Sequence, residues 1–385
     1  MAQEDRQLIY FDQSATSVHK PPEVAEAVAL GLRGGYGNPS RGAHDPALHA
    51  LQEVAKARRA VAAYFGASPL EVAFTFNATM ALNMAIKGAL TTGDCVLTTP
   101  YSHNAMLRPL YEMQDRGMRL DIMPLDQQGG CTLAGIMQHI RPDTTALALN
   151  PMSNVTGDTV LLAEIIALCR QRDLLLILDM AQWAGTRPMP HIDNWPRTLI
   201  AFTGHKSLYG PQGIGGLINL GQVPLSPIIT GGSGTHSFDR QHPGVFPDVC
   251  EAGTPNVPGL MGLRAGLQWL TETGPDAVQQ RLAMLRGRFV AGLAQIPQVK
   301  VYGGEQADAG PVVSINLGDM PSSSLSDALY QKHGIATRSG AHCAPLMHRA
   351  LGTVQQGTVR FSFSYFKCTE EVDCALEALD ALSTQ

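Results

Sequence analysis

The fold is decided by two consecutive stretches, LLLILDMAQ at residues 174–182 and TLIAFTGHKSLYGPQGIGGL at residues 198–217. Each begins with an apolar run and then changes to polar residues and glycine. Apolar runs of this length without polar alternation are typical of strands that are buried on both faces of a parallel sheet. The two stretches therefore predict two strands of such a sheet, each ending in polar residues.

Helical and strand-like patterns alternate on both sides of these stretches, from about residue 50 onward. The predicted elements are a helix over 48–66 that ends at Gly66, a strand over 72–76, a helix over 79–90 and strands over 94–99 and 145–150. This alternation predicts an α/β fold with a doubly wound, mostly parallel sheet.

The last third of the chain has a different pattern, which predicts a second, smaller α+β domain. Residues 258–296 are helical, and they are followed by a strand at 299–303, a helix at 323–334, two short strands and a closing helix at 369–382. We predict three parts: residues 1–20 as an N-terminal segment that packs on the small domain, 21–265 as the large domain and 266–385 as the small domain. The boundary at 265 is expected inside a helix.

Composition excludes several classes of protein. The 385 residues contain 28 Lys and Arg against 33 Asp and Glu, a net charge of 28 − 33 = −5, and no basic run suited to nucleic acid. The seven cysteines form no CxxC pair, which argues against a zinc ribbon or a disulfide framework. The longest aliphatic run, Leu174 to Leu178, is too short to span a bilayer. We therefore expect a cytoplasmic protein with neither a membrane nor a nucleic-acid partner.

Polar residues at strand ends are the first candidates for a site, because ligands of open α/β sheets bind there. Asn77, Ala78 and Thr79 follow the strand at 72–76 and begin a helix, whose free N–H groups and dipole favour a phosphate. The alternative is that Asn77 or Thr79 only caps this helix.

Asp179 ends the first apolar run. Burial disfavours an ionised carboxylate, so Asp179 should have a cationic or protonated partner, and Gln182 can reach the same space. The alternative is a carboxylate that caps the following turn.

Lys206 follows the second apolar run, beside His205. Partial burial would lower the pKa of this lysine and make its amine a usable nucleophile. The alternative is an ordinary surface lysine. His103 follows the strand at 94–99, where a lone histidine is more often structural than catalytic.

Taken together, these strand ends match the requirements of pyridoxal phosphate. Lys206 would form the Schiff base, Asp179 would keep the pyridine nitrogen protonated, and His103 would stack on the ring. The helix that begins near Ala78 and Thr79 would hold the phosphate. The combination is more specific than any one of its members.

The small domain adds a candidate carboxylate anchor, Arg360. It lies in TVRFSFSY at 358–365, where alternation places Val359, Phe361, Phe363 and Tyr365 on one face and Arg360, Ser362 and Ser364 on the other. With small neighbours, Arg360 has room to bind the carboxylate of an amino acid. The alternative is a surface salt bridge.

Cys343 lies in a loop of about 17 residues, 341–357, which is long enough to be a candidate functional loop. His342, His348 and Arg338 are close in sequence, and such cations would lower the pKa of the thiol. Zinc binding by His342, Cys343 and His348 lacks a fourth ligand, so no metal site is predicted.

The chain resembles the class V aminotransferase group of fold-type I pyridoxal-phosphate enzymes over nearly its whole length. Within that group it is similar to the cysteine desulfurases of the SufS and CsdA type, with selenocysteine lyase close by. The matching segments are YFDQSATS (10–17), FTFNATMALNMAIKG (74–88), SHNAMLRPL (102–110), SNVTG (153–157), LDMAQ (178–182), TGHKSLYGPQGIGGL (203–217), EAGTPN (251–256), RSGAHCAP (338–345) and VRFSFSYF (359–366).

The resemblance implies a seven-stranded large-domain sheet, a homodimer and a role for each matched residue. Lys206, Cys343 and His103 correspond to catalytic residues. Those implied in cofactor binding are Ala78, Thr79, His103, Asn154, Asp179, Gln182, Thr203, His205, Lys206 and Thr254, the last reaching the phosphate of the neighbouring subunit. Those implied in substrate binding are Arg360, Asn154, Arg338 and Ala15.

The resulting hypothesis is a pyridoxal-phosphate-dependent cysteine desulfurase that converts L-cysteine to L-alanine and leaves the sulfur on Cys343 as a persulfide. A sulfur- or selenium-acceptor protein, in a pathway such as iron–sulfur cluster assembly, would then take the sulfur. The alternatives are a selenocysteine lyase acting on L-selenocysteine, a C–S lyase or aminotransferase that does not need Cys343, and a non-catalytic protein of this fold.

Overall fold

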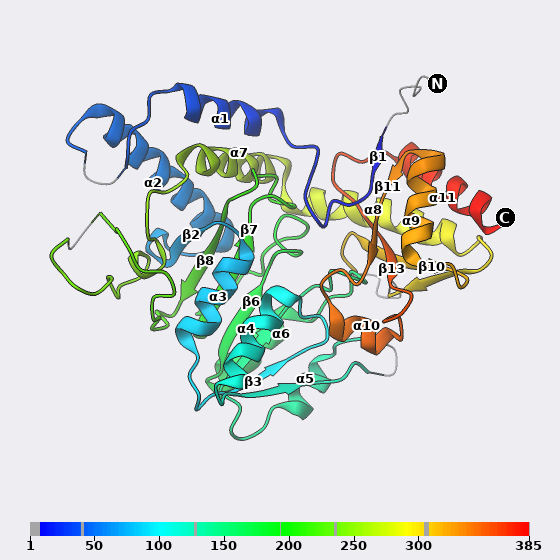
Figure 1. The fold of residues 1–385 in the computed structure, drawn as a ribbon, viewed down its shortest axis with the longest axis horizontal. Helices are drawn as coiled ribbons and strands as arrows, with labels where there is room; N and C mark the ends of the chain where they lie inside the picture. Colours follow the sequence, from blue (N-terminus) through cyan, green and yellow to red (C-terminus); the bar gives the residue numbers. More distant parts are fainter. Residues whose placement is uncertain are drawn as a thin grey trace.

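The protein is described from a computed structural model that places residues 8–39, 42–126, 129–192, 194–234, 237–303 and 308–384. Figure 1 shows two layered regions, a larger one built on a long central sheet and a smaller one that contains both the C-terminal helices and the strand nearest the N-terminus.

The helices of the described chain are α1 (Pro22–Arg33), α2 (Asp45–Phe65), α3 (Ala78–Ala89), α4 (Asn104–Asp115), α5 (Leu133–His139), α6 (Leu162–Arg172), α7 (Val257–Thr273), α8 (Pro275–Leu293), α9 (Ser322–His333), α10 (Pro345–Leu351) and α11 (Thr369–Ser383). The strands are β1 (Ile9–Tyr10), β2 (Val72–Thr75), β3 (Cys95–Thr98), β4 (Arg119–Ile122), β5 (Ala146–Leu149), β6 (Leu175–Asp179), β7 (Thr198–Thr203), β8 (Gly215–Leu220), β9 (Val299–Tyr302), β10 (Val312–Leu317), β11 (Ile335–Ala336), β12 (Arg338–Gly340) and β13 (Thr358–Ser362).

The central sheet has seven strands in the order β2-β8-β7-β6-β5-β3-β4. Strand β8 runs antiparallel to both of its neighbours, and the other adjacent pairs are parallel. The predicted α/β fold with a mostly parallel seven-stranded sheet is therefore confirmed.

Strand β6 shows why its sequence is apolar throughout. Leu176 and Leu178 pack into a core that also contains residues of α2, α6 and α7. Leu175 and Ile177 face the opposite way, into a core with residues of α3 and α4. Because both faces of the strand are covered, no position before Asp179 tolerates a polar side chain without a partner.

The smaller region has its own four-stranded antiparallel sheet, in the order β12-β13-β10-β9, which packs with α8 and α9, and α11 packs on these two helices. This agrees with the predicted α+β region. Residue 265 falls inside α7, and the division of the chain at that point stays a prediction.

The N-terminal segment lies against the smaller region. Strand β1 pairs in parallel with β11, and Asp12 forms a further bridge with Ser362 of β13 (Figure 1). From there the chain turns towards the central sheet, where Ser17 bonds to the backbone of His205. Residues 9–17 therefore connect both sheets.

Two predicted elements differ from the structure. Strand β13 ends at Ser362 rather than at Tyr365, and all five of its residues are buried, with the N-terminal segment bridged to the strand at Ser362. The predicted loop at 341–357 contains the helix α10, which ends at Gly352 in a left-handed conformation. The non-helical loop that contains Cys343 is therefore shorter than predicted from the sequence.

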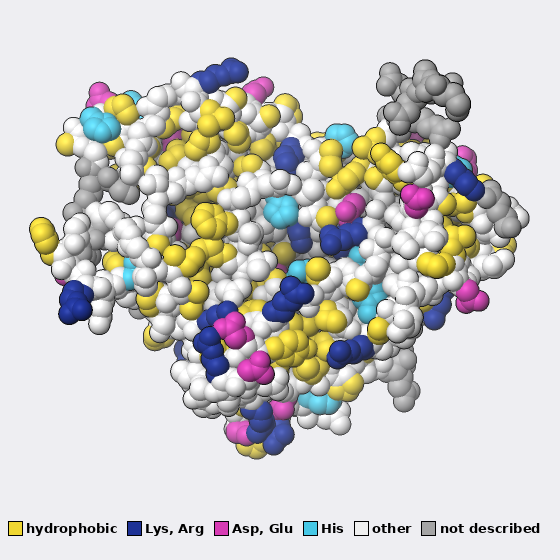
Figure 2. Space-filling view, in the orientation of Figure 1, with side chains coloured by type: hydrophobic (Ala, Val, Ile, Leu, Met, Phe, Trp, Pro, Cys, Tyr) yellow, Lys and Arg dark blue, Asp and Glu magenta, His cyan; other side chains and the backbone are white. Residues whose placement is uncertain are grey.

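The surface agrees with the small net charge. On the face shown in Figure 2, basic and acidic side chains are interspersed. Within the described ranges, no helix combines the length and apolarity needed to span a membrane.

Candidate active site

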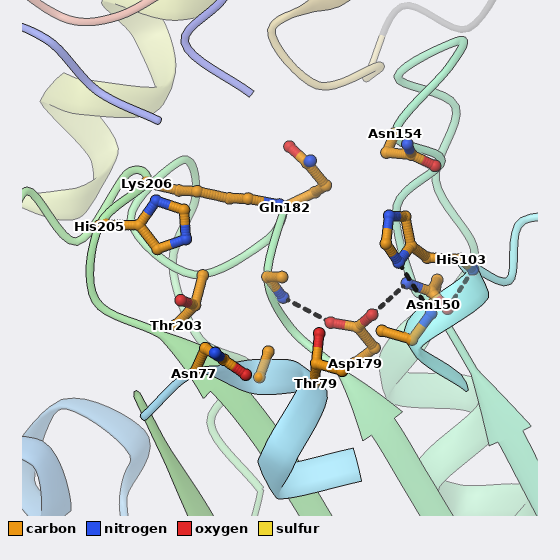
Figure 3. Close-up of a pocket in the computed structure, with 13 residues that line it drawn as sticks. Asn77, Thr79, His103, Asn150, Asn154, Asp179, Gln182, Thr203, His205 and Lys206 are labelled. Atoms are coloured by element: carbon orange, nitrogen blue, oxygen red, sulfur yellow. Dashed lines mark hydrogen bonds between the residues drawn. The ribbon is translucent and has the colours of Figure 1, made fainter. Parts of the chain in front are cut away.

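A cavity lies at the carboxyl ends of the central strands. It is lined by Asn77, Ala78, Thr79, His103, Ala105, Asn150, Asn154, Asp179, Ala181, Gln182, Thr203, His205 and Lys206 (Figure 3). The set contains His103, Asp179, Gln182, His205 and Lys206, which were predicted from their positions at strand ends. Because β7, β6, β5 and β3 are consecutive neighbours, the segments that follow them deliver Lys206, Asp179, Asn150 and His103 to one place.

Asp179 is held by two hydrogen bonds. One carboxylate oxygen accepts from the backbone N–H of Ala181 at 3.0 Å, and the other accepts from Nδ2 of Asn150 at 2.8 Å. The two donors fix the orientation of the carboxylate, and Asp179 is only 4% exposed. Asn150 was not predicted as a site residue, although its position directly after a strand is the same signal that identified Asp179.

The first turn of α3 forms one wall of the cavity. The side chain of Asn77 accepts from the backbone N–H of Met80 at 3.0 Å, so the capping interpretation of Asn77 is confirmed. Ala78 and Thr79 both line the cavity, and first-turn N–H groups have no acceptor within their own helix. Capping and anion binding are therefore compatible here.

Two further polar groups face the same end of the cavity. Within the described residues, Oγ1 of Thr203 and Nδ1 of His205 are buried without a hydrogen-bond partner. Burial lowers the pKa of His205 to about 4, and the charges of Lys206 and Lys20 lower it further, so its imidazole is neutral near pH 7. A helix N-terminus, a hydroxyl and an imidazole without partners suit a phosphate group.

Lys206 lies beside His205 in the turn after β7 and lines the same cavity (Figure 3). Burial lowers the pKa of its amine to about 8, with opposing contributions from Asp179, which raises it, and Arg360, which lowers it. The turn packs closely on Gly185, where an added Cβ would lie 1.9 Å from the carbonyl oxygen of Ser207. The sequence prediction of a buried lysine with a lowered pKa therefore agrees with the structure.

His103 caps helix α4 and lines the cavity. Its Nδ1 accepts from the backbone N–H of Ala105 at 3.0 Å, so the proton of the neutral imidazole is on Nε2. Burial lowers the pKa of His103 to about 4, against the opposing charge of Asp179, which raises it. His103 is therefore a neutral donor near pH 7.

Gln182 and Asn154 are oriented by backbone contacts. Nε2 of Gln182 donates to the carbonyl oxygen of Ser14 at 3.2 Å. Nδ2 of Asn154 donates to the carbonyl oxygen of His342 at 2.8 Å, and its Oδ1 is buried with no partner in the described residues. Asn154 therefore joins the central cavity to the Cys343 loop.

Arg360 is buried rather than exposed. Its guanidinium donates to Asp12 at 2.8 Å and to the carbonyl oxygen of Asn154 at 3.2 Å, and its side chain is 2% exposed. The alternative of a surface salt bridge is therefore wrong, because the N-terminal segment covers this strand. Arg338 is paired with Arg360 across β12 and β13, and both positive charges contribute to lowering the pKa of Lys206.

Cys343 lines a second cavity, together with Thr79, Asn83, His103, Asn104, Ala105, Arg108, Pro109 and Glu112. Thr79, His103 and Ala105 line both cavities, so the two adjoin at the imidazole. His342 and Cys343 have φ angles of 49° and 56°, a conformation that costs about 1 kcal/mol or more for each such residue. The carbonyl oxygen of Cys343 accepts from the backbone N–H of Asn104 at 2.7 Å, which holds the backbone of this turn against the start of α4.

The predicted positive charge around Cys343 is wrong for its two histidines. Burial lowers the pKa of His342 well below its ordinary value, and burial also lowers that of His348. One ring nitrogen of His342 is hydrogen-bonded to Thr358, and one of His348 to Thr353. The centroids of the two imidazole rings lie 5.6 Å apart. Two neutral imidazoles cannot supply the cations that the sequence indicated.

Two further predicted residues, Thr254 and Ala15, also do not line the central cavity. Thr254 is exposed, accepts from Nδ2 of Asn38 at 3.4 Å, and lines a separate cavity with Phe74, Phe76 and Met80. Ala15 lies in the N-terminal segment next to Ser14, which contacts Gln182. The predicted roles of Thr254 and Ala15 stay predictions.

The model of the class-V aminotransferase family matches residues 9–374. The chain belongs to this family. Among curated relatives of this chain, the probable cysteine desulfurase of Pyrococcus abyssi is 32% identical, covering 98% of this chain and 94% of the relative. The cysteine desulfurase of Serratia proteamaculans is also 32% identical, covering 97% of this chain and 93% of the relative.

Solved structures give the same result. The apo cysteine desulfurase of Thermococcus onnurineus superposes with a TM-score of 0.89 at 29% identity, covering 98% of this chain and 95% of that one. The cysteine desulfurase CsdA of Escherichia coli superposes with a TM-score of 0.85 at 28% identity, covering 97% of this chain and 94% of that one. The family predicted from the sequence is thus confirmed.

Membership of this family also confirms the predicted enzyme and its cofactor, pyridoxal phosphate. The residues present fit that group, because the unpartnered Thr203 and His205 line the same cavity as the first turn of α3, Lys206 and Asp179. The assignment of each residue to a part of the cofactor stays a prediction.

Proposed function

We propose that this protein is a cysteine desulfurase that releases L-alanine from L-cysteine and keeps the sulfur as a persulfide on Cys343. The observation that carries the proposal is the adjoining of the two cavities at His103, one containing Lys206 and Asp179 and the other Cys343. A sulfur removed from a substrate in the first cavity has a thiol next to it in the second. The names of the curated relatives support the same activity.

Substrate binding is assigned to the two arginines and Asn154. Arg360 and Arg338 lie opposite each other on neighbouring strands, and residues opposite each other in an antiparallel pair project from the same face. Asp12 pairs with Arg360, while Arg338 makes no ion pair with the described carboxylates. One uncompensated positive charge thus remains for the carboxylate of L-cysteine.

Bound pyridoxal phosphate supplies an electron sink that weakens the bonds at the substrate α-carbon. Lys206, with its lowered pKa, is the group placed to take and return the α-proton. His103 holds a proton on Nε2 at the boundary between the two cavities. Asp179 is held in place by its two donors and lines the cavity, where it would be the partner for a protonated ring nitrogen.

The sulfur transfer is assigned to Cys343. Its thiolate forms a bond to the substrate sulfur, and the carbon–sulfur bond of the substrate breaks with its electron pair remaining on carbon. Protonation of that carbon gives L-alanine, and Cys343 retains the added sulfur as a persulfide. An acceptor protein that removes this sulfur belongs to the same proposal.

A homodimer and a cytoplasmic location are also part of the proposal. Thr254 lines a different cavity from the one that contains Lys206, so a role in cofactor binding would be at the site of the partner subunit. Phe238 is fully exposed on the segment before it, as an interface residue of an isolated subunit would be.

Cys343→Ser tests the function. With L-cysteine and a reductant, the variant should form alanine and sulfide at about one hundredth of the wild-type rate or less. Its visible cofactor absorbance should be retained, and mass spectrometry should show no added sulfur. Cys374→Ser is the matched control, because Cys374 is exposed on α11.

The alternatives give different outcomes. Full alanine and sulfide release by Cys343→Ser would contradict the proposal and favour a C–S lyase or aminotransferase. Activity with L-selenocysteine that persists in Cys343→Ser, with none toward L-cysteine in the wild type, would favour a selenocysteine lyase.

A further inference from the structure

Donors from one short segment converge on a single carbonyl oxygen, that of His205. They are the backbone N–H of Ser17 at 3.0 Å, Oγ of Ser17 at 3.1 Å, Oγ1 of Thr16 at 3.2 Å and Nζ of Lys20 at 3.5 Å. A carbonyl oxygen has two lone pairs, so four donors within hydrogen-bonding distance is an unusual concentration. The segment is nearly 190 residues away in the sequence.

Lys20 is the charged member of this group. Its Nζ donates to Oγ of Ser17 at 2.7 Å, and Oγ of Ser17 donates in turn to the His205 carbonyl. The side chain is half-buried, and no carboxylate of the described residues lies within ion-pair distance of it. Burial lowers the pKa of its amine to about 8. Lysines usually extend their amines to water, so one held among neutral acceptors costs stability.

The carbonyl that these donors hold belongs to the peptide bond preceding Lys206. The same turn is fixed from its other side, where the carbonyl of Lys206 accepts from the N–H of Tyr209 at 3.0 Å and the N–H of Gly204 donates to Ile214 at 2.8 Å. Together these contacts fix the plane of the peptide from which the Lys206 side chain extends. A reacting amine loses much of its advantage when its anchor moves by about 1 Å.

We infer that Lys20 is a positioning residue for Lys206, acting through Ser17 and the carbonyl oxygen of His205. It does not touch the cofactor cavity, and it is not among the residues that line it. The inference rests on the proposed role of Lys206 as the residue that bonds to pyridoxal phosphate, and it is independent of the sulfur chemistry proposed for Cys343.

The test compares two cofactor forms. Pyridoxal phosphate bonds covalently to a lysine, whereas pyridoxamine phosphate carries an amine in place of the aldehyde and binds without that bond. The ratio of their dissociation constants therefore isolates the contribution of Lys206. Both constants are measured on apoprotein by titration, for the wild type, Lys20→Met, Ser17→Ala and Lys20→Arg.

We expect Lys20→Met and Ser17→Ala to weaken pyridoxal phosphate binding about tenfold while changing pyridoxamine phosphate binding by about twofold at most. Lys20→Arg, which keeps a charged donor, should stay within about threefold of the wild type for both. Lys56→Met is the matched control, because Lys56 is a half-exposed lysine of α2 that pairs with Glu53. It should bind both forms as the wild type does.

Equal weakening of both cofactors in Lys20→Met would overturn the inference, since it would mean a loss of the phosphate end or of the fold. Unchanged binding of both would overturn it as well. Ser17→Ala keeps the lysine charge, so it tests the connection even where Lys20→Met is poorly folded. Lys206→Ala should abolish the difference between the two forms; if it does not, Lys206 itself is wrongly assigned, and that result is distinguishable from a failure confined to Lys20.

Discussion

The carboxylate of Asp12 lies 2.8 Å from the guanidinium of Arg360, and this ion pair joins the N-terminal segment to strand β13. The arginine is buried, whereas Asp12 is one-fifth exposed. Removing one partner of a buried pair leaves the other charge uncompensated, which is more costly than the pair itself is stabilising.

Asp12→Asn should therefore destabilise the protein by about 2–3 kcal/mol, somewhat less than for a fully buried pair because Asp12 is partly exposed. Urea unfolding of wild type and variant measures the difference. Asp373→Asn is the control, since Asp373 pairs with Arg288 on the surface and should cost far less stability than Asp12→Asn. Equal losses in both variants would show that the Asp12 pair is not effectively buried.

Asn150→Ala should weaken the site through Asp179. The variant removes one of the two donors to that carboxylate, and losing a hydrogen bond to a charged group corresponds to about a tenfold effect. We expect both the affinity for pyridoxal phosphate and kcat to fall by about that factor. Gln268→Ala, at an exposed position of α7, is the control and should leave both unchanged. An unaltered Asn150→Ala enzyme would mean that Ala181 alone suffices to hold Asp179.

The residues at strand ends could be predicted because the signal is local. A run of apolar residues that ends in Asp179 or is followed by Lys206 shows in the sequence both that the strand is buried and that its end is polar. Parallel pairing then brings these ends together without further information. Asn150 follows the same rule and could have been identified by it.

The contacts of the N-terminal segment could not be predicted. Asp12 reaches Arg360, and Ser17 with Lys20 reaches His205, only because the chain crosses between the two sheets. Nothing in the local pattern specifies that crossing. The predicted positive charge of His342 was wrong for a related reason. The burial of this histidine depends on tertiary packing and not on its sequence neighbours.

His103 should make the apoprotein sensitive to acid. Its pKa is lowered from 6.5 to about 4 by burial, so between these values the unfolded chain binds a proton that the folded chain does not. Stability therefore falls as the pH falls from 6.5 to 4. His103→Asn keeps an acceptor for the N–H of Ala105 and should reduce this fall by about 2 kcal/mol.

Chemical unfolding of apoprotein at pH 6.5 and pH 4.5 measures this effect. The matched control is His49→Asn, because His49 is exposed on α2 and should leave the pH dependence as it is in the wild type. A fall of the same size in wild type and His103→Asn would place the acid sensitivity elsewhere, with His205 as the next candidate.

Lys206 should affect the stability of the apoprotein at alkaline pH, whereas His103 affects it at acidic pH. Burial lowers the pKa of its amine from 10.5 to about 8, so the folded chain releases its proton before the unfolded chain does. Below pH 8 both states are protonated and the full cost of burying the charge is present. Stability then rises with pH between 8 and 10.5 as that cost is relieved.

Lys206→Met removes the charge, so the apoprotein should be about 2 kcal/mol more stable than the wild type at pH 7, with the difference nearly gone at pH 10. Urea unfolding at both pH values, with Lys56→Met as the surface control, tests this; a difference of equal size at pH 7 and pH 10 would mean that Met stabilises by packing alone.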